Sequence, residues 1–301
     1  MTDLYFRLYD LQLKLTVFTD QKLLIPPKIR PFIHHTMSNR FSNALELNCY
    51  AHASVKEALG TNLEQSKKFP PLLFSQLSAK AHKSVAFQDT IHYLHRNIQK
   101  GRFDNFISPK NKIGFYHAIT SNNGIYLDSN SLFFHCAMSA PLNQAIFLHG
   151  AAFAPEKKGL LFLGQSGIGK STLVNTYPLQ NPYTDESILL KYWNDRFWLI
   201  PNPFYQFQFQ ADIPSKSPVP VEAVCFLEKG TTTQLVKLDM LPHQILEKLI
   251  THVFFFSLMN PPIYLATMEL LIRMAKQAQY YTAIINPQEQ NLFAQFNNTN
   301  L

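Results

Sequence analysis

The chain has 301 residues, of which 46% are hydrophobic and 16% are charged, and its formal net charge is +7. The apolar content excludes a disordered charged tail, and 10 glycines without a repeat exclude a collagen-like chain or a Gly/Ser linker. The positive charge favours an anionic partner, but no run of five or six like charges is present, so we expect no dedicated nucleic-acid surface.

The cysteines and the hydropathy of the chain indicate its compartment. Cys49, Cys136 and Cys225 are far apart in sequence and form no disulfide framework, which favours a reducing environment. The most apolar stretch, residues 253–259, is much shorter than the roughly 20 residues of a membrane span. Charged residues interrupt the first ten positions, unlike a signal peptide. We therefore expect a cytoplasmic protein without a membrane span.

The first 135 residues carry mixed signals of secondary structure. Residues 11–17 alternate between apolar and polar, which predicts a half-buried strand. We expect helices near residues 76–86 and 90–99. Short apolar runs separated by turn residues predict hairpin strands between 112 and 136. These patterns favour a first domain, residues 1–135, of α+β character and unassigned role.

The composition changes near residue 135, and we expect a second domain over residues 136–301. Five of the ten glycines lie between Gly150 and Gly169. The predicted elements, in chain order, are a buried helix 138–148, a strand 159–163, a helix 171–177, a hairpin of 187–192 and 196–200, a strand 221–227, helices 242–255 and 263–277, and a strand 280–285.

One motif in this second part points to phosphate binding. It fits the Walker A pattern G-x-x-x-x-G-K-[ST] and reads Gly164-Gln165-Ser166-Gly167-Ile168-Gly169-Lys170-Ser171-Thr172. Glycines let successive backbone N–H groups turn toward a phosphate, which side chains would obstruct. Lys170 is expected to reach the β- and γ-phosphates, and the Ser171 hydroxyl to bind Mg²⁺. The predicted strand before the loop and the helix after it are the setting that this motif requires.

The residues around the loop resemble the HPr kinase/phosphorylase family. The resemblance covers about residues 147–230 and rests on four short runs: His149-Gly150-Ala151-Ala152, Gly159-Leu160-Leu161-Phe162-Leu163-Gly164, Ser166-Gly167-Ile168-Gly169-Lys170-Ser171 and Thr184-Asp185-Glu186. It implies an α/β fold of α+β character, with a P-loop kinase core related to that of phosphoenolpyruvate carboxykinase and a β-rich N-terminal region.

The resemblance also implies residue roles, with ATP and Mg²⁺ as ligands. Asp185 and Glu186 fall on the family's acidic pair, of which one member is the general base and one helps to hold Mg²⁺. His149 falls on the histidine near the γ-phosphate. Glu186 and Thr172 depart from the family pattern, and its second, glycine-rich signature is missing. These departures argue against HPr as substrate and against phosphorolysis.

The chemistry of phosphoryl transfer leads to the same carboxylates independently. The reaction needs positioning, charge neutralisation and a group that accepts the proton of the nucleophile. Asp185 lies 15 residues after Lys170, enough for one helix and a return strand. Glu228, which follows the apolar run 223–227, is a competing Walker-B-like carboxylate. For His149, a hydrogen-bonded core position is the alternative.

We therefore expect an ATP-dependent kinase that phosphorylates a hydroxyl of a small molecule or a protein. Two alternatives stay open. One is an ATP-binding regulatory or assembly module with little catalysis. The other is a carboxykinase-like lyase, which needs a clamp for a substrate carboxylate. No arginine cluster suited to such a clamp is evident, because Arg196 is the only arginine between the loop and Arg273. The sequence leaves open whether the protein is a homo-oligomer.

Overall fold

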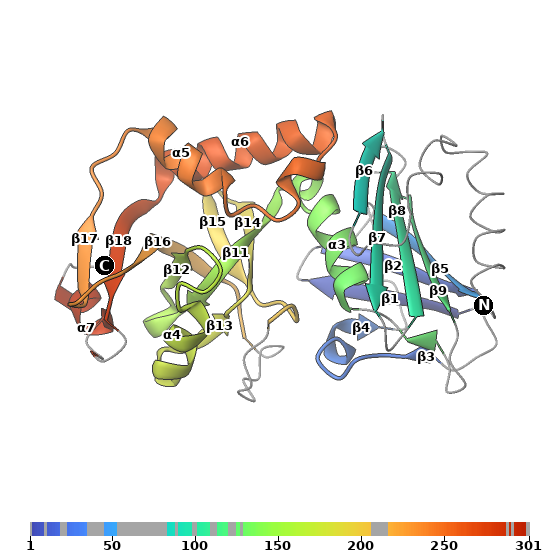
Figure 1. Ribbon diagram of the computed structural model, residues 1–301, viewed down its shortest axis with the longest axis horizontal. Helices are drawn as coiled ribbons and strands as arrows, with labels where there is room; N and C mark the ends of the chain where they lie inside the picture. The colour runs from blue at the N-terminus through green and yellow to red at the C-terminus, as the bar shows by residue number, and fades with distance from the viewer. Residues whose placement is uncertain are drawn as a thin grey trace. The chain divides into compact units, whose positions relative to one another are not determined.

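The computed structural model is a mixed α/β structure whose parts are drawn in Figure 1. It describes residues 2–8, 11–18, 23–34, 45–52, 83–87, 90–97, 101–108, 113–119, 125–126, 129–205, 216–286, 289 and 292–298. The chain divides into two compact units. The first comprises residues 1–143 and 257–264, and the second comprises residues 144–256 and 265–301.

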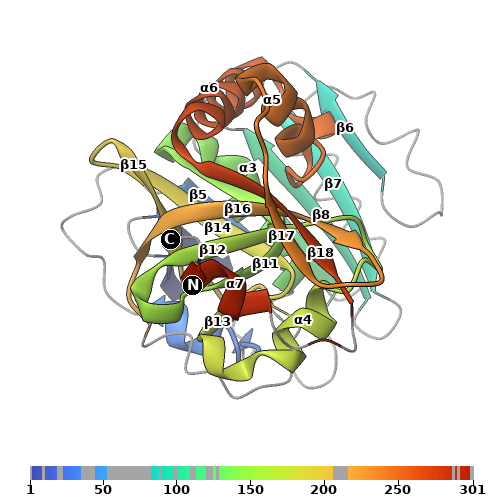
Figure 2. The ribbon, with the colours of Figure 1, turned by 90° about the vertical axis from the view of Figure 1, so that its left-hand side faces the viewer.

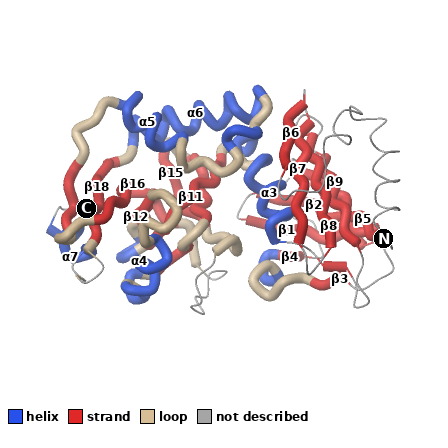
Figure 3. Tube along the Cα trace, viewed as in Figure 1, coloured by secondary structure: helices blue, strands red, loops and turns tan. Residues whose placement is uncertain are grey.

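The first unit is built on a mixed sheet of order β4-β1-β2-β5-β9-β8-β7-β6. Its strands are β1 (Thr2–Leu8), β2 (Leu11–Phe18), β4 (Ile33–His34), β5 (Leu45–His52), β6 (Lys83–Phe87), β7 (Thr90–Asn97), β8 (Gly101–Ser108) and β9 (Ile113–Ile119). A short parallel pair joins β3 (Leu23–Leu24) to β10 (Ile125–Tyr126). The described part of this unit is mostly strand, as Figure 3 shows, which agrees with the expected β-rich N-terminal region.

Helix α3 (Ser129–Ser139) packs against β7 and β8. It is buried on most of its surface, with Leu132, Phe134 and Met138 fully inaccessible to solvent. The predicted strand 11–17 is confirmed as β2, which pairs with β1 in an antiparallel hairpin.

The predicted helix 90–99 is wrong, because these residues form strand β7. Its β-branched and aromatic residues, Ile91 and Tyr93 among them, suit a strand, and β7 pairs with β6 on one edge and β8 on the other. Residues 83–86 of the predicted helix 76–86 also belong to a strand, β6, and residues 76–82 lie outside the described residues. In both cases, hydrogen-bonded pairing with the neighbouring strands decides the structure.

The prediction of hairpin strands between 112 and 136 is confirmed only in part. β9 and β10 are strands, but they do not form a hairpin with each other: β9 pairs with β5 and β8, and β10 pairs with β3. The last part of the segment, from Ser129, belongs to α3.

The second unit is built on a sheet of order β12-β11-β14-β15-β16-β18-β17, with β13 beside β11. Its strands are β11 (Ala145–Phe153), β12 (Gly159–Leu163), β13 (Pro182–Thr184), β14 (Ser187–Trp193), β15 (Arg196–Ile200), β16 (Val219–Lys229), β17 (Gln234–Lys237) and β18 (Gln279–Ile285). β12 also pairs with β16 in parallel, so the pairings close a circuit through β11, β14, β15, β16 and β12.

Four α-helices complete the described part of this unit. They are α4 (Lys170–Thr176), α5 (Pro242–Ile250), α6 (Pro261–Gln277) and α7 (Leu292–Asn298). Figures 1 and 2 both show α5 and α6 on one side of the strands and α4 on the other. Counting both units, short 3₁₀ segments lie at Arg30–Phe32, Pro141–Asn143, Pro155–Lys157, Pro178–Gln180 and Phe256–Leu258. No helix among the described residues is long and apolar enough to cross a membrane.

The predicted buried helix 138–148 is wrong. Helix α3 ends at Ser139, just before Pro141, which disfavours helical backbone at Ala140. The chain then enters β11, in which every residue except His149 is buried. A strand covered on both faces is continuously apolar and lacks the period-two signature, so the sequence alone does not separate it from a buried helix.

The remaining predicted elements of the second unit are confirmed, with one change of length. Strands 159–163, 221–227 and 280–285, the hairpin 187–200 and helices 171–177 and 263–277 correspond to β12, β16, β18, β14–β15, α4 and α6. The predicted helix 242–255 ends at Ile250, because the next residues bond to β11: the His149 N–H donates to the His252 carbonyl and the Phe254 N–H to the Phe147 carbonyl. The sequence-based boundary at residue 135 lies inside α3.

Gly150 provides a test of this packing. A Cβ there would lie 2.6 Å from Ile188 Cδ1, 2.8 Å from Leu163 Cδ2 and 2.8 Å from the Phe162 carbonyl oxygen. We expect Gly150→Ala to lower the free energy of unfolding by about 1–3 kcal/mol, because a backbone atom cannot move aside as a side chain can. Urea unfolding measures this, and Lys276→Ala on the exposed face of α6 is the control. Equal stability of the two variants would contradict the close packing of β11 against its neighbours at Gly150.

Candidate functional site

The glycine loop, residues 164–169, joins β12 to α4 and depends on its glycines. Gly167 and Gly169 have φ angles of 78° and 117°, in the left-handed region that strains other residues. A Cβ on Gly164 would lie 2.8 Å from Ile168 Cγ2 and 3.1 Å from Leu227 Cβ. The backbone therefore needs glycine at all three positions. Gln165, Ser166 and Gly167 at the outer turn of the loop are exposed.

Lys170 holds the glycine loop from within. Its side chain is buried, and its ammonium Nζ donates hydrogen bonds to the carbonyl oxygens of Gly164 (2.9 Å) and Gln165 (3.0 Å). Burial lowers the pKa of Lys170, and the nearby carboxylates of Glu186 and Asp185 partly offset this effect. A phosphate entering the loop would compete with two neutral carbonyls for the ammonium, and an anion is the stronger acceptor.

The segment between β13 and β14 places two carboxylates beside β11. The Thr184 hydroxyl oxygen accepts the backbone N–H of Glu186 (3.2 Å) and of Ser187 (3.1 Å), which fixes the turn. The Gly150 N–H of β11 donates to the Glu186 carbonyl oxygen at 3.0 Å. Asp185 is only 2% exposed, and its carboxylate interacts electrostatically with Lys170.

Glu186 is paired with a histidine from β11. His149 Nε2 lies 3.8 Å from Glu186 Oε1, with side-chain exposures of 27% and 35%. The contact with His149 lowers the pKa of Glu186, and the charge of Lys170 lowers it further, while burial acts in the opposite direction. Glu186 is therefore a carboxylate at neutral pH. The structure thus brings His149, Lys170, Asp185 and Glu186 together around the loop.

A cavity of about 790 Å³ opens beside the glycine loop. His149 and the loop residues Gly164, Gln165, Ser166 and Ile168 form one wall, and the end of β16, including Glu228, forms another. The third wall comes from α5 and the residues after it. It contains Gln244, Glu247, Lys248, Thr251 and His252. None of the residues that line this cavity in the described chain is an arginine.

The sequence alone did not predict this third wall. Its residues carry no motif, because α5 has the ordinary pattern of an amphipathic helix that buries Ile245 and Leu249. The adjacent His252 becomes part of the site only through its pairing with β11. His252 lies inside the helix 242–255 that the sequence predicts, where a histidine is a weak signal, and no spacing rule connects it to Gly169, 83 residues earlier.

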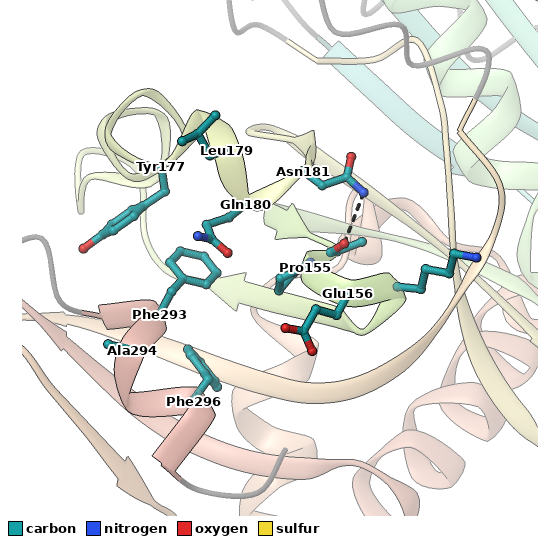
Figure 4. Close-up of a pocket in the computed structure, with 11 residues that line it drawn as sticks. Pro155, Glu156, Tyr177, Leu179, Gln180, Asn181, Phe293, Ala294 and Phe296 are labelled. Carbon is teal, nitrogen blue, oxygen red and sulfur yellow. Dashed lines mark hydrogen bonds between the residues drawn. The ribbon is translucent and has the colours of Figure 1, made fainter.

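A second cavity, of about 740 Å³, lies near the C-terminal end of α4. Figure 4 shows Tyr177, Phe293 and Phe296 on one side of it and Pro155 and Glu156 on the other. The rings of Tyr177 and Phe293 are 4.8 Å apart between centroids. None of the residues proposed from the sequence for phosphate chemistry lines this cavity.

The residues of the loop fit a Mg²⁺-nucleotide in their chemistry. Ser171 and Thr172 are exposed on the first turn of α4, directly after the buried Lys170. In the described part of the chain, no group of three or more His, Cys, Asp and Glu side chains is arranged to hold a metal ion. A Mg²⁺ ion in this place would therefore take most of its ligands from phosphate oxygens and water, as this cation usually does.

Comparison with known proteins adds little to this geometry. No protein-family model matches the chain, and no curated protein matches it. Among solved structures, the chain is similar to an HPr(Ser) kinase/phosphatase from Coxiella burnetii, with 13% identity, a TM-score of 0.31, and coverage of 51% of this chain and 91% of that one. A likeness of this degree carries no argument about activity, so the function has to be inferred from the site.

The pairing of His149 with Glu186 gives a pH-dependent prediction. In His149→Ala, the pKa of Glu186 should rise, because the contact that lowers it is lost while burial remains. A lowered carboxyl pKa stabilises the fold above the unfolded-state pKa, and this contribution is lost as the pH falls through the folded-state pKa. The variant should therefore lose less stability than the parent in that acidic range.

NMR titration of the Glu186 carboxyl carbon measures this shift. His243→Ala, at an exposed position of α5, is the control and should leave the pKa of Glu186 as it is. An unchanged pKa in His149→Ala would show that the two side chains do not interact in solution.

Proposed function

We propose that the protein is an ATP-dependent phosphotransferase with a kinase core like that of HPr kinase, which transfers the γ-phosphoryl group of ATP to a hydroxyl. The observation that carries the proposal is the buried ammonium of Lys170 inside a loop with left-handed glycines, next to Asp185, Glu186 and His149. Phosphoryl transfer needs positioning and charge neutralisation above all, and this arrangement supplies both.

The proposed phosphate contacts come from the glycine loop and Lys170. Loop amides would hold the phosphate oxygens, and the Lys170 ammonium would exchange its two carbonyl acceptors for the β- and γ-phosphates. Ser171 and Asp185 would hold Mg²⁺. When bound, Mg²⁺ neutralises charge on the phosphate oxygens.

The proposed proton acceptor is a carboxylate of the Asp185–Glu186 pair. Glu186 is the better candidate, because its pKa is lowered and its side chain is partly exposed, so it is ionised and accessible to an acceptor. Asp185 is buried next to Lys170, which suits a metal ligand. His149 would keep the Glu186 carboxylate in place through their contact.

The two alternative functions are separable from this one. A carboxykinase-like lyase would need a cationic clamp for a substrate carboxylate, and the described cavity lining offers Lys248 but no arginine. A regulatory module would bind ATP without turnover, and the His149–Glu186 pair would then have no chemical task. This pair is the reason to favour catalysis. HPr is not proposed as the acceptor, in line with the departures in sequence.

The first test is Lys170→Ala. We expect loss of phosphoryl transfer and about 10- to 150-fold weaker binding of ATP·Mg²⁺, since a charge-assisted hydrogen bond contributes about 1.5–3 kcal/mol. Calorimetry measures the binding and ³¹P NMR measures the turnover. Lys276→Ala, at an exposed position of α6, is the matched control. Unchanged nucleotide affinity in Lys170→Ala would refute the assignment of the loop.

The second test compares the three carboxylates that the sequence left open. Glu186→Gln should lower kcat by about 10²- to 10⁴-fold, the usual contribution of a general base, with little change in the Mg²⁺ concentration required. Asp185→Asn should lower kcat and also raise the Mg²⁺ requirement. Mg²⁺ titrations of the initial rate separate the two. If Glu228→Gln had the largest effect on the Mg²⁺ requirement, the Walker-B-like alternative would be correct instead.

A further inference from the structure

The third wall of the cavity, formed by α5 and the residues after it, has no task in the proposed phosphate binding. Its titratable residues are Glu247 and Lys248 on α5 and His252 after it. We propose that these three residues form the subsite for the phosphate acceptor, and that the acceptor is a small polyhydroxylated molecule, a sugar or a polyol. This inference rests on the proposed function and specifies its second substrate.

His252 is held firmly in position beside the catalytic candidates. Its carbonyl oxygen accepts the His149 N–H at 2.7 Å, and its own N–H donates to the Leu249 carbonyl at 3.0 Å. The next residue, Val253, forms a β-bridge with Leu148. His252 and His149 both line the cavity, and His149 contacts Glu186, the group proposed to accept the proton.

The imidazole of His252 suits a hydroxyl ligand. Burial lowers its pKa to about 4, and the positive charges of His149 on β11, Lys170 on α4 and Lys248 on α5 contribute. At neutral pH the ring is therefore uncharged, with one nitrogen that donates and one that accepts a hydrogen bond. A hydroxyl also donates and accepts. His252 is thus a positioning residue and leaves the proton transfer to the carboxylates.

The other side chains of the wall extend the same chemistry. The Lys248 ammonium lies 5.2 Å from the centroid of the Phe226 ring, which holds it at the cavity wall. Glu247 is exposed and adds a carboxylate that only accepts. A donor, an acceptor and a group that does both match a ligand with several hydroxyls. An adenine ring would favour aromatic surfaces, and the second cavity has three such side chains, Tyr177, Phe293 and Phe296, where the first has Phe226 (Figure 4).

The size of the cavity also favours a small acceptor. Its volume of about 790 Å³ lies within the range of about 300–1,000 Å³ typical of small-molecule sites. This space accommodates the terminal phosphates and a molecule of sugar size. A protein substrate would instead need a broader surface for recognition around its reacting side chain.

The experiment offers the protein ATP·Mg²⁺ with each of glycerol, ribose, glucose, myo-inositol and a serine-containing peptide, and follows phosphate transfer by ³¹P NMR. We expect transfer to at least one of the four polyols and sugars and none to the peptide. For the active acceptor, Lys248→Ala, Glu247→Gln and His252→Asn should each raise KM about tenfold or more, with the KM for ATP within about twofold of the parent.

Matched controls and a separate binding measurement make each outcome informative. His243→Asn on α5 and Lys276→Ala on α6 are exposed, line neither cavity, and should leave both KM values unchanged. His252 is buried, so His252→Asn could fail to fold. Glu247 is exposed, and Glu247→Gln then still tests the subsite.

Three results would overturn the acceptor subsite while leaving the phosphotransferase intact: transfer to the peptide alone, transfer to none of the probes by a protein that binds and hydrolyses ATP, or wall variants that raise the KM for ATP instead. If calorimetry detects no ATP binding by the parent protein, the proposed function itself fails and this subsite fails with it.

Discussion

The two hydrogen bonds from the Lys170 ammonium to the loop carbonyls of Gly164 and Gln165 are the interaction on which the candidate site depends. A buried ammonium costs free energy unless it is hydrogen-bonded, and here loop carbonyls and two neighbouring carboxylates supply that compensation. The lysine thereby shapes the loop before any ligand arrives. A phosphate would find a charged donor already in place, so that little conformational freedom remains to be lost on binding.

Strand β11 connects this loop to the acidic pair Asp185–Glu186 and to the segment that carries His252. One edge of β11 pairs with β12, which leads into the glycine loop, and the other edge pairs with β13 and β14, which flank Asp185 and Glu186. The chain after α5 also forms hydrogen bonds with β11, which places His252 at the cavity. Gly150 is needed where these neighbours are closest. Three segments far apart in sequence thus meet because one buried strand serves as their common partner.

Local signals were sufficient where an element and its function lie in one continuous stretch. The strand, loop and helix around the glycine motif follow from neighbouring residues, because left-handed glycines and an apolar run constrain the backbone locally. Local signals failed for β7 and β11, whose residues are compatible with both helix and strand. β7 is a strand because it pairs with β6 and β8. β11 is a strand that follows the end of a helix before Pro141 and is buried on both faces.

By itself, the sequence determined the conformation of the loop, the lysine that fills it and the presence of an acidic pair at a suitable distance along the chain. Only the tertiary structure decided that His149 contacts Glu186, that Asp185 is buried near Lys170, and that α5 with His252 closes the cavity. The physical reason is the range of the forces involved. Backbone sterics act between adjacent residues, whereas hydrogen bonds and charge pairs between side chains depend on strand pairing across many intervening residues.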